Sequence, residues 1–392
     1  MENAMLFPGD TIGIIGDSQN GIMLAQAAKK MGFKVAAYCT GQSVPTLSEA
    51  DVKIVGRMND KEKLQDFAQR CNVVTYESEN IASETVEFLE RFTKVPQGHE
   101  TLEITQDRLL ERAFFEQLNV NIAPYATIVS LDDIYQEIGS IGYPCVLKPI
   151  QKGFGKRRQQ MITKQTDIAR CADIIDFGTY ILESWVECAK ELSVVLTRGA
   201  DGEVNFFPLV ENVYRDRVLH ETLAPAKVPE QIEQEAKRIA KEIVRGLSYV
   251  GVMQVAFFLT AEGTLYVKRL IPALSVPGYV LEQASSVSMF EQHLRALAKM
   301  PLENAVPRTS GAMVIVSTAD LEKVRLQWSL KSNWSYRFFR IPETLRPVER
   351  EGYILVSAET PEKAAAQIEA TGIWDEAKTC LLYTSPSPRD CS

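Results

Sequence analysis

The sequence predicts an α/β protein that opens with a doubly wound domain, and three features of its first 80 residues carry this prediction. The apolar run Thr11–Ile15 is typical of a short buried strand. A polar, glycine-bearing loop over 16–21 and a helical pattern over 22–31 follow it, and residues 34–38 and 73–76 are further strand-like runs. Strands that alternate with helices in this way favour a parallel sheet covered on both faces.

Composition and charge indicate a globular protein without a nucleic-acid or membrane partner. The 392 residues suggest two to three domains, and 45% are hydrophobic. The net charge is −8 and no block of five or more basic residues occurs, which disfavours binding to a phosphate backbone. No apolar run approaches the roughly 18–20 residues of a membrane span, and the first nine residues do not resemble a signal peptide, so we expect a cytoplasmic protein.

The cysteines favour no redox or metal centre. Cys39, Cys71, Cys145, Cys171 and Cys188 are scattered along the chain without CxxC spacing, and none of the three histidines lies near a cysteine pair. We interpret these cysteines as reduced core residues.

The first loop and the strand at 73–76 offer two candidate ligand contacts. The glycine spacing over 16–21 is not GxGxxG and no acid ends the second strand, so a dinucleotide fingerprint is absent and an α/β oxidoreductase is disfavoured. The strand at 73–76 ends in Thr75–Asn80, a polar run in the position where open α/β sheets bind ligands. A capped turn without a ligand explains the same run.

The middle of the chain contains a basic segment that is suited to phosphate. Lys148 ends the apolar strand 145–148, where a lysine is either a phosphate ligand or a surface residue with a buried stem. The basic, glycine-bearing run 152–158 could cover phosphates but is not a Walker A loop. The remaining expected elements are helices over 106–118, 230–247 and 290–299, strands over 179–183 and 191–197, a hairpin over 251–270, and short strands alternating with loops after 311.

The last stretch of the sequence breaks the preceding pattern. Residues 380–390 read CLLYTSPSPRD, which resembles a translated adapter from sequencing-library preparation. We therefore expect residues 380–392 to be an artefact, and a genuine disordered tail is the alternative.

Six motifs follow one another along about 220 residues: TYESEN at 75–80, QDRL at 106–109, ESWV at 183–186, ELSV at 191–194, FPLVEN at 207–212 and FEQHLRA at 290–296. In this order they resemble the motifs of one family, the 5-(carboxyamino)imidazole ribonucleotide synthases of the ATP-grasp superfamily. The resemblance extends over nearly the whole chain to about Tyr353.

The resemblance implies a fold, a reaction and a dimer. The fold would comprise an N-terminal doubly wound domain over 1–100, a two-lobed ATP-grasp domain over 101–300 and a small β-rich C-terminal domain over 301–379. The family uses ATP, magnesium and bicarbonate to carboxylate aminoimidazole ribonucleotide in purine biosynthesis, usually as a homodimer. Residues in family-like positions for the nucleotide are Arg108, Lys148, Glu183, Trp185, Val186 and Glu191. Those for the substrate are Gln19, Tyr76, Glu77, Asn80 and Arg350.

The departures from the family pattern fall on the expected metal site. The resemblance places a glutamate where this chain has Ala256, an asparagine at Lys268 and a glutamate at Arg269. Magnesium prefers oxygen ligands, which alanine, lysine and arginine do not supply. The family's PRPHNSGH loop, its glycine-rich flap at 152–159, its first loop at 16–21 and its basic cluster near 349–353 are also altered. No residue of the chain is therefore predicted with confidence to be catalytic or to bind metal.

Two interpretations remain open. In the first, the chain is a catalytically impaired or inactive member that still binds adenine nucleotide, with Lys268 and Arg269 neutralising phosphates, and that assembles as a homodimer or with a catalytic paralogue. In the second, it is an active synthase or ATP-grasp ligase in which other carboxylates, such as Glu211 or Glu282, hold the metal.

Overall fold

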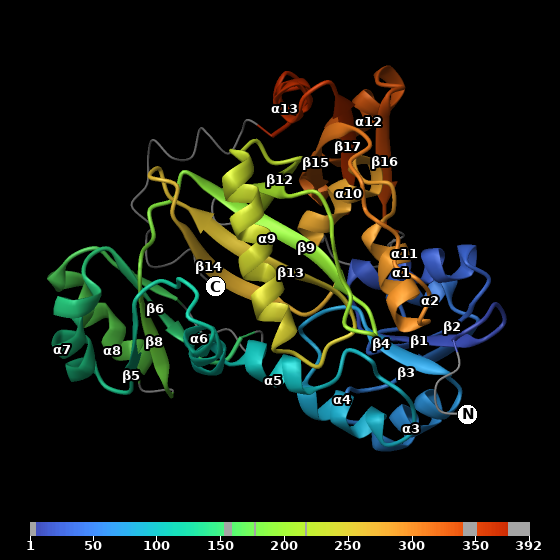
Figure 1. Cartoon of the computed structure of the whole chain (residues 1–392), viewed down its shortest axis with the longest axis horizontal. Helices are drawn as coiled ribbons and strands as arrows, with labels where there is room; N and C mark the ends of the chain where they lie inside the picture. Colours follow the sequence, from blue (N-terminus) through green and yellow to red (C-terminus); the bar gives the residue numbers. More distant parts are fainter. Residues whose placement is uncertain (1–4, 153–158, 176–177, 216–217, 340–350, 375–392) are drawn as a thin grey trace.

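The structure is a computed structural model that describes residues 5–152, 159–175, 178–215, 218–339 and 351–374. Its elements form three sheets, which Figure 1 shows as a lobe at one end, a large central sheet and an N-terminal sheet. The predicted α/β class with a doubly wound N-terminal domain, a two-lobed central part and a β-rich C-terminal part is confirmed. The boundaries between domains stay a prediction, and the expected artefact at 380–392 lies outside the described residues.

The N-terminal sheet is parallel, with strand order β3-β2-β1-β4. The strands are β1 (Thr11–Ile15), β2 (Lys34–Cys39), β3 (Val52–Val55) and β4 (Val73–Tyr76). Its helices are α1 (Gln19–Lys30), α2 (Thr46–Glu49), α3 (Lys61–Gln69) and α4 (Ser83–Glu90). The central strand β1 lies between β2 and β4, and it is buried on both faces because helices cover the sheet.

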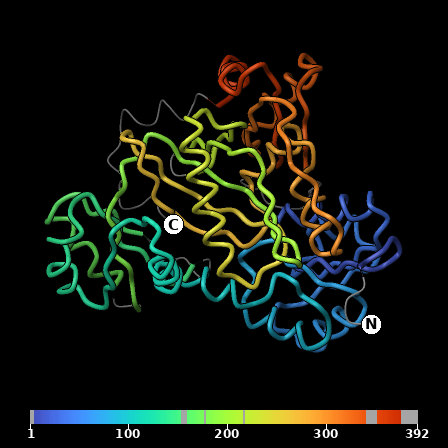
Figure 2. Tube along the Cα trace, viewed as in Figure 1, coloured from blue at the N-terminus to red at the C-terminus, as the bar shows by residue number. Residues whose placement is uncertain are grey.

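The small lobe has a sheet and a hydrophobic core of its own. The sheet is antiparallel, with order β5-β8-β6-β7, and comprises β5 (Tyr125–Ile128), β6 (Cys145–Pro149), β7 (Gln160–Ile162) and β8 (Tyr180–Ser184). Helices α7 (Leu131–Ile141) and α8 (Ala172–Ile175) and the 3₁₀ turn η1 (Gln165–Cys171) pack on it. Figure 2 shows this lobe, in green, standing apart from the N-terminal sheet.

The central sheet continues without a break into the C-terminal part of the chain. Its order is β14-β13-β9-β11-β12-β15-β17-β16, with β10 paired to β9. The strands are β9 (Lys190–Arg198), β10 (Val204–Phe206), β11 (Val210–Arg215), β12 (Val218–Ala224), β13 (Gly251–Leu259), β14 (Leu265–Ile271), β15 (Ser310–Val316), β16 (Trp334–Phe338) and β17 (Gly352–Ala358).

Helices attach the central sheet to the rest of the molecule. Helix α9 (Glu230–Arg245) crosses one face in Figure 1, and α5 (Glu100–Gln106) and α6 (Arg108–Gln117) lead from the N-terminal sheet to the small lobe. The segments η2 (Val276–Val280), α10 (Leu281–Ala284) and α11 (Met289–Leu297) follow β14. One continuous core contains apolar residues from β1, β4, α9 and β13, so the N-terminal and central sheets are packed together.

Two sequence expectations are corrected by the structure. The helix expected over 106–118 is α6, which begins at Arg108 because Asp107 is extended and caps it through Leu109 N and Leu110 N, and α5, directly before it, was not expected. The region after 311, expected to contain only strands and loops, also contains η3 (Thr318–Asp320), α12 (Leu321–Leu330) and α13 (Pro361–Glu369). Helix α12 has few buried residues and therefore gave no clear periodic signal. Among the described residues, no helix is long and apolar enough to cross a membrane.

Candidate active site

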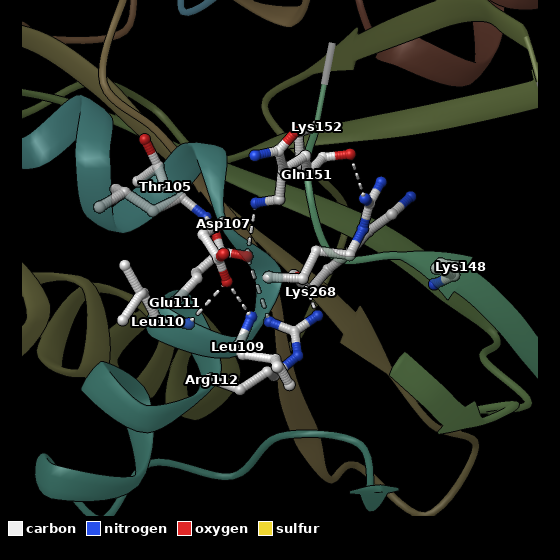
Figure 3. A network of polar contacts seen from close by, with 12 residues as sticks. Thr105, Asp107, Leu109, Leu110, Glu111, Arg112, Lys148, Gln151, Lys152 and Lys268 are labelled. Carbon is white, nitrogen blue, oxygen red and sulfur yellow. Dashed lines mark hydrogen bonds and ion pairs between the residues drawn. The ribbon is translucent and has the colours of Figure 1, made fainter. Parts of the chain in front are cut away.

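A network of ion pairs lies where the small lobe, helix α6 and the β13–β14 hairpin meet (Figure 3). It joins basic and acidic side chains from five elements or their ends. The residues that define it are Arg108, Glu111, Arg112, Lys148, Lys152, Glu183, Glu191, Lys268 and Arg269. Below, these nine residues are called the charge network.

Glu183, at the end of β8, is held between two cations. Its Oε1 accepts from Arg112 Nε at 2.7 Å and its Oε2 accepts from Lys148 Nζ at 2.6 Å. Burial alone would raise the pKa of Glu183, but Arg112 and Lys148 outweigh burial and lower this pKa to about 2. Strands β6 and β8 are paired, and this register brings Lys148 and Glu183 close together. The lysine that ends the apolar strand is therefore directed into the site.

Glu111 connects helix α6 to the hairpin and to the segment after β6. Its carboxylate accepts from Lys152 Nζ at 2.5 Å and from Leu270 N at 3.0 Å, and Arg112 Nη1 lies 3.4 Å away. Figure 3 shows the Lys152 side chain extending toward this carboxylate. Burial lowers the pKa of Lys152, and the nearby Glu111 carboxylate opposes this effect only in part. Lys152 is thus a desolvated cation whose position is fixed by a buried carboxylate.

Lys268 occupies a bulge in strand β14. The register of the β13–β14 pair shifts between Ala256 and Phe257, so Lys268 has no cross-strand partner. Its Nζ donates to Glu191 Oε2 at 2.6 Å and lies over the Tyr214 ring at 4.6 Å and the Phe258 ring at 5.0 Å. Burial lowers the pKa of Lys268, whereas Glu191 raises it. A carboxylate and two aromatic rings therefore hold this ammonium group in one place.

Arg269 borders two cavities that flank the hairpin. It pairs across the strands with Ala256, and its buried Nε has no hydrogen-bond partner among the described residues. One cavity, of about 170 Å³, is also lined by Glu79, Arg108 and Lys152. The other, of about 430 Å³, is also lined by residues that follow β1 and β4 of the N-terminal domain, over 18–20 and 78–80. An unpaired guanidinium N–H at this point is suited to an anionic ligand.

Arg108, at the start of α6, holds the chain that follows β6. Its Nη1 donates to the carbonyl of Pro149 at 2.5 Å and to that of Gln151 at 3.3 Å. Burial lowers the pKa of Arg108, and Glu183 and Glu111 partly counteract this. This arginine therefore positions the segment that enters residues 153–158, the expected phosphate flap, which lies outside the described residues.

The first loop and the end of β4 form the floor of the 430 Å³ cavity. Glu77 is fully buried, and its carboxylate accepts from the Ser18 backbone N–H at 2.9 Å and from the Ser18 hydroxyl. Burial raises the pKa of Glu77 to about 7, although the Ser18 hydrogen bonds oppose the rise. Asn20 donates to the carbonyls of Glu77 and Leu274, and its Oδ1 accepts from Tyr279 Oη at 2.7 Å. This floor is rigid and polar.

The expected substrate residues are divided between this cavity and the core. Gln19 and Asn80 line the 430 Å³ cavity, and Asn80 also lines the 170 Å³ cavity. Tyr76 is fully buried, with its hydroxyl donating to the Gly98 carbonyl at 3.3 Å, and it lines neither cavity. Arg350 lies outside the described residues. The structure thus places Gln19 and Asn80 at one cavity, whereas Glu77 is buried against Ser18 and lines neither cavity, and the role of each residue stays a prediction.

The expected adenine hinge follows β8. The Trp185 side chain is 48% exposed, and its backbone N–H donates to the Pro144 carbonyl at 2.9 Å. Val186 is half-buried. Strand β9 carries Glu191 beside β13, so the hinge, Lys148 and Glu191 surround the same edge of the charge network.

The residues present do not fit a magnesium ion in this network. Ala256 offers no oxygen ligand, and Lys268 and Arg269 place positive charge next to it. The carboxylates Glu111, Glu183 and Glu191 are each bound to a cation. Among the described residues, no group of three or more His, Cys, Asp or Glu side chains could hold a metal.

Comparison with known proteins agrees with this geometry. Residues 10–106 match the ribonucleotide synthetase preATP-grasp domain, and residues 113–290 match the ATP-grasp domain. The chain is 35% identical over 314 residues to the N5-carboxyaminoimidazole ribonucleotide synthase of Bacillus subtilis, and the match covers 80% of this chain and 83% of that protein. The chain belongs to the N5-carboxyaminoimidazole ribonucleotide synthase family. The resemblance inferred from the sequence motifs is therefore confirmed.

Solved structures of synthases from this family share the whole fold. The ADP complex of one N5-carboxyaminoimidazole ribonucleotide synthetase has a TM-score of 0.91 at 31% identity, covering 96% of this chain and 99% of that one. The Staphylococcus aureus N5-carboxyaminoimidazole synthetase has a TM-score of 0.89 at 27% identity, covering 95% and 99%. The positions at which the sequence departs from the family resemblance therefore lie within a fold that these synthetases share.

Sequence reasoning missed several members of the charge network. Glu111 and Arg112 follow the QDRL motif on α6. Charged residues are usually expected at the surface, but here Glu111 is 0% and Arg112 6% exposed. A signal was available, because Arg108 and Arg112 are four residues apart and share one face of the helix. Asn20 and Tyr279 were also missed, since their contact joins residues 259 positions apart.

Proposed function

We propose that this chain is a synthase-family protein that binds adenine nucleotide without magnesium and in which the ATP-dependent carboxylation of aminoimidazole ribonucleotide is strongly impaired. The observation that carries the proposal is the Lys268–Glu191 ion pair beside Ala256 and Arg269, at the positions where the family resemblance implies metal ligands. The family's reaction belongs to purine biosynthesis. We therefore expect the ligand that this chain still binds to be one of the compounds of that reaction.

An excess of positive charge supports nucleotide binding. In the charge network, six basic side chains face the three carboxylates of Glu111, Glu183 and Glu191. Glu79, which lines the cavity beside Arg269, reduces this excess but does not cancel it. Partly buried cations without counterions are costly, so the network favours an anionic ligand such as a di- or triphosphate.

The same charges oppose a divalent ion. At a separation of about 4 Å and an effective dielectric constant of about 20, a divalent and a monovalent cation repel each other by roughly 8 kcal/mol. Lys268 cannot readily move away, because Glu191, Tyr214 and Phe258 hold its ammonium group. Without the metal, stabilisation of the transferring phosphoryl group would be weakened, and this predicts slow turnover or none.

An active synthase with a relocated metal is the alternative, and two carboxylates were candidates for it. Glu211 is paired with Lys190. Glu282 accepts from Tyr353 Oη at 2.8 Å and lies 3.3 Å from Arg337 Nε, in the C-terminal part of the molecule. Both carboxylates are already engaged with other groups, so this alternative has less support.

A binding experiment tests the nucleotide proposal. Calorimetric titration with ATP is done once with magnesium and once with EDTA, on the unmodified protein. We expect saturable binding in both conditions, with no more than a threefold difference in Kd. Strict dependence on magnesium, or no saturable heat in either buffer, contradicts the proposal.

A turnover experiment tests the proposed impairment. ATP hydrolysis is measured with aminoimidazole ribonucleotide, bicarbonate and magnesium for the unmodified protein and for the triple variant Ala256→Glu, Lys268→Asn, Arg269→Glu. We expect substrate-dependent turnover only in the triple variant. Robust turnover by the unmodified protein refutes the impairment, whereas inactivity of both proteins places a lesion outside the metal position.

Assembly is a separate part of the proposal. The FEQHLRA helix and the N-terminal domain retain family-like sequences, which supports a homodimer or a heterodimer with a catalytic paralogue. Light scattering over a range of concentrations tests it. A monomer at every concentration, with no paralogue recovered by affinity capture, contradicts this part and leaves the nucleotide proposal intact.

A further inference from the structure

A third cavity lies between the N-terminal and C-terminal parts of the chain, away from the charge network. Its volume is about 620 Å³, within the range of roughly 300–1,000 Å³ that is usual for small-molecule sites. One wall is helix α1, another is the segment from α10 into α11, and a third is the end of β16. Figure 1 shows α11 beside α1. This cavity shares no lining residue with the two cavities that Arg269 borders.

A buried hydroxyl in the wall lacks a hydrogen-bond partner. Ser285 lines the cavity and is 2% exposed, yet its Oγ bonds to no described residue. A buried hydroxyl without a partner is destabilising, so such groups are rare unless a ligand or water satisfies them. Ser285 comes just before α11, a nine-residue helix whose N-terminus opens on the same cavity through Ser288 and Phe290. The first N–H groups of a helix favour an anion.

Two exposed cations at the cavity have no counterion. Lys30, at the end of α1, and Arg308 both line it, and neither forms an ion pair or side-chain hydrogen bond with a described residue. The two carboxylates in the walls are already engaged. Glu282 is bonded to Tyr353 and Arg337, and Glu291 to Arg295. The cavity therefore presents unpaired positive charge.

Apolar side chains, three of them aromatic, line part of the cavity beside polar residues such as Gln26 and Ser286. Met23, Met31, Phe290, Phe338 and Phe339 contribute to it. An inorganic anion would leave this surface unused, whereas an organic anion with an apolar or aromatic body would cover it. We infer that the cavity between α1, α11 and β16 binds a small aromatic or apolar molecule with one anionic head, a phosphate or a carboxylate. Lys30, Arg308, Ser285 and the N-terminus of α11 bind the head.

Calorimetric titration of the full chain tests this inference with four probes: phenyl phosphate, benzoate, inorganic phosphate and benzyl alcohol. We expect saturable binding of phenyl phosphate or benzoate, at least tenfold tighter than that of inorganic phosphate or benzyl alcohol. Which of the first two binds more tightly identifies the head group. No saturable binding of either one overturns the inference, and so does equal binding of inorganic phosphate.

Variants then locate the probe. Lys30→Ala and Arg308→Ala replace exposed side chains, so the fold is retained, and each should weaken binding at least fivefold. Ser285→Ala should weaken binding without lowering Tm, because it removes an unpaired buried hydroxyl. Ala27→Leu should block binding by filling the cavity while leaving its charges unchanged.

Two controls separate this site from its surroundings and from the charge network. Arg325→Ala removes an exposed cation of α12 that does not line the cavity, and Lys268→Met alters the other site. Both variants should bind the probe as the unmodified protein does. Loss of binding in either control, or unchanged binding in Arg308→Ala and Lys30→Ala, overturns the assignment. Since Lys268→Met concerns only the nucleotide proposal, the two proposals fail independently.

Discussion

The Lys268 ammonium lies 2.6 Å from the Glu191 carboxylate and joins the bulge in β14 to strand β9. The resemblance to synthases places a metal ligand at the first position and a nucleotide contact at the second. The pair thus puts a monovalent cation, fixed in the protein, where a soluble divalent cation is expected. Because of this ion pair, substitutions at Lys268 and Glu191 can test nucleotide affinity and metal dependence separately.

Replacement of Lys268 by methionine should weaken ATP binding in EDTA by at least tenfold, because one partly desolvated cation is lost from the phosphate side of the network. Calorimetry measures the change. Lys190→Met is the matched control, since Lys190 forms a similar pair with Glu211 on neighbouring strands and should change the affinity less than threefold. Unchanged affinity in Lys268→Met contradicts a phosphate-binding role.

A double variant distinguishes two ways in which Lys268 could act. If Lys268 contacts phosphate, Lys268→Met combined with Glu191→Gln should bind ATP as weakly as Lys268→Met alone. If Lys268 acts only by compensating the negative charge of Glu191, then removing that charge with Glu191→Gln should restore the affinity for ATP. Recovery in the double variant therefore assigns Lys268 a positioning role.

Glu183 should make the protein sensitive to acid. Its folded-state pKa of about 2 lies below the ordinary value of 4.5, so its stabilisation is present above pH 4.5 and is lost as the pH falls toward 2. The loss is on the order of 3 kcal/mol. Urea unfolding between pH 7 and pH 3 should show this slope in the unmodified protein, and Glu183→Gln should flatten it.

The same variant should also be less stable at neutral pH, because Arg112 and Lys148 lose their shared counterion. The expected loss is about 3 kcal/mol or more for a buried pair with one partner removed. Glu187→Gln, an exposed position three residues past the strand end, is the control and should leave both stability and slope unchanged. A Glu183→Gln variant with an unaltered acid slope would show that another group causes the acid sensitivity.

The scaffold could be predicted from the sequence because its signals are local. Strands β1 and β4 have the predicted bounds, since each is a short, largely apolar run buried on both faces. Helix α6 lies within the range predicted for it and begins at Arg108, because Asp107 is extended and acts as its cap. Helix α5, of seven residues, was not predicted. Helix α12 was missed because it buries little apolar surface.

The site could be predicted only in part, because ion pairs between distant segments have no local signature. The sequence identified Lys148, Glu183, Glu191, Lys268 and Arg269 individually through the family resemblance. It did not predict that Lys268 pairs with Glu191 or that Lys148 pairs with Glu183, since those contacts depend on strand register. Gln19 and Asn80 lie at one cavity because β1 and β4 are adjacent parallel strands.

His293, from the FEQHLRA helix, should stabilise the junction of two sheets. It is fully buried, its Nδ1 accepts from the Val252 N–H at 3.0 Å, and its Nε2 lies 2.9 Å from Thr75 Oγ1. Burial lowers the pKa of His293 to about 3. Because the unfolded chain takes up a proton near pH 6.5 and the folded protein does not, stability should fall as the pH drops below 6.5.

The variant His293→Ala should lose about 2–4 kcal/mol of unfolding free energy, through the cavity and the unsatisfied Val252 N–H. Gly251→Ala is a second test of the same packing. Gly251 has a φ of +132°, and a Cβ there would lie 2.7 Å from the His293 ring. The Gly251→Ala variant should lose a similar amount of unfolding free energy. Gly139→Ala should not, because a Cβ at Gly139 would meet open space. Unchanged stability in His293→Ala contradicts the structural role.

Glu77 should give the opposite pH dependence from His293. Its folded-state pKa of about 7 lies above the ordinary 4.5, so the folded protein retains a proton that the unfolded chain releases. Stability is therefore favoured below pH 4.5 and declines as the pH rises from 4.5 to 7, by an amount on the order of 3 kcal/mol. This decline would be masked in the unmodified protein, because His293 contributes a rise over part of the same interval.

The variant Glu77→Gln separates the two effects. Glutamine keeps an oxygen for the Ser18 N–H and cannot ionise, so the variant should gain stability relative to the unmodified protein as the pH rises from 4.5 to 7. Urea unfolding at pH 5, 6 and 7 measures the difference. Glu87→Gln, which replaces a half-exposed glutamate of α4, should show no such gain. A difference between Glu77→Gln and the unmodified protein that stays constant across these pH values would mean that Glu77 is ionised throughout. The Glu77 carboxylate, which is buried against Ser18 and does not line the 430 Å³ cavity, would then be negatively charged in the folded protein.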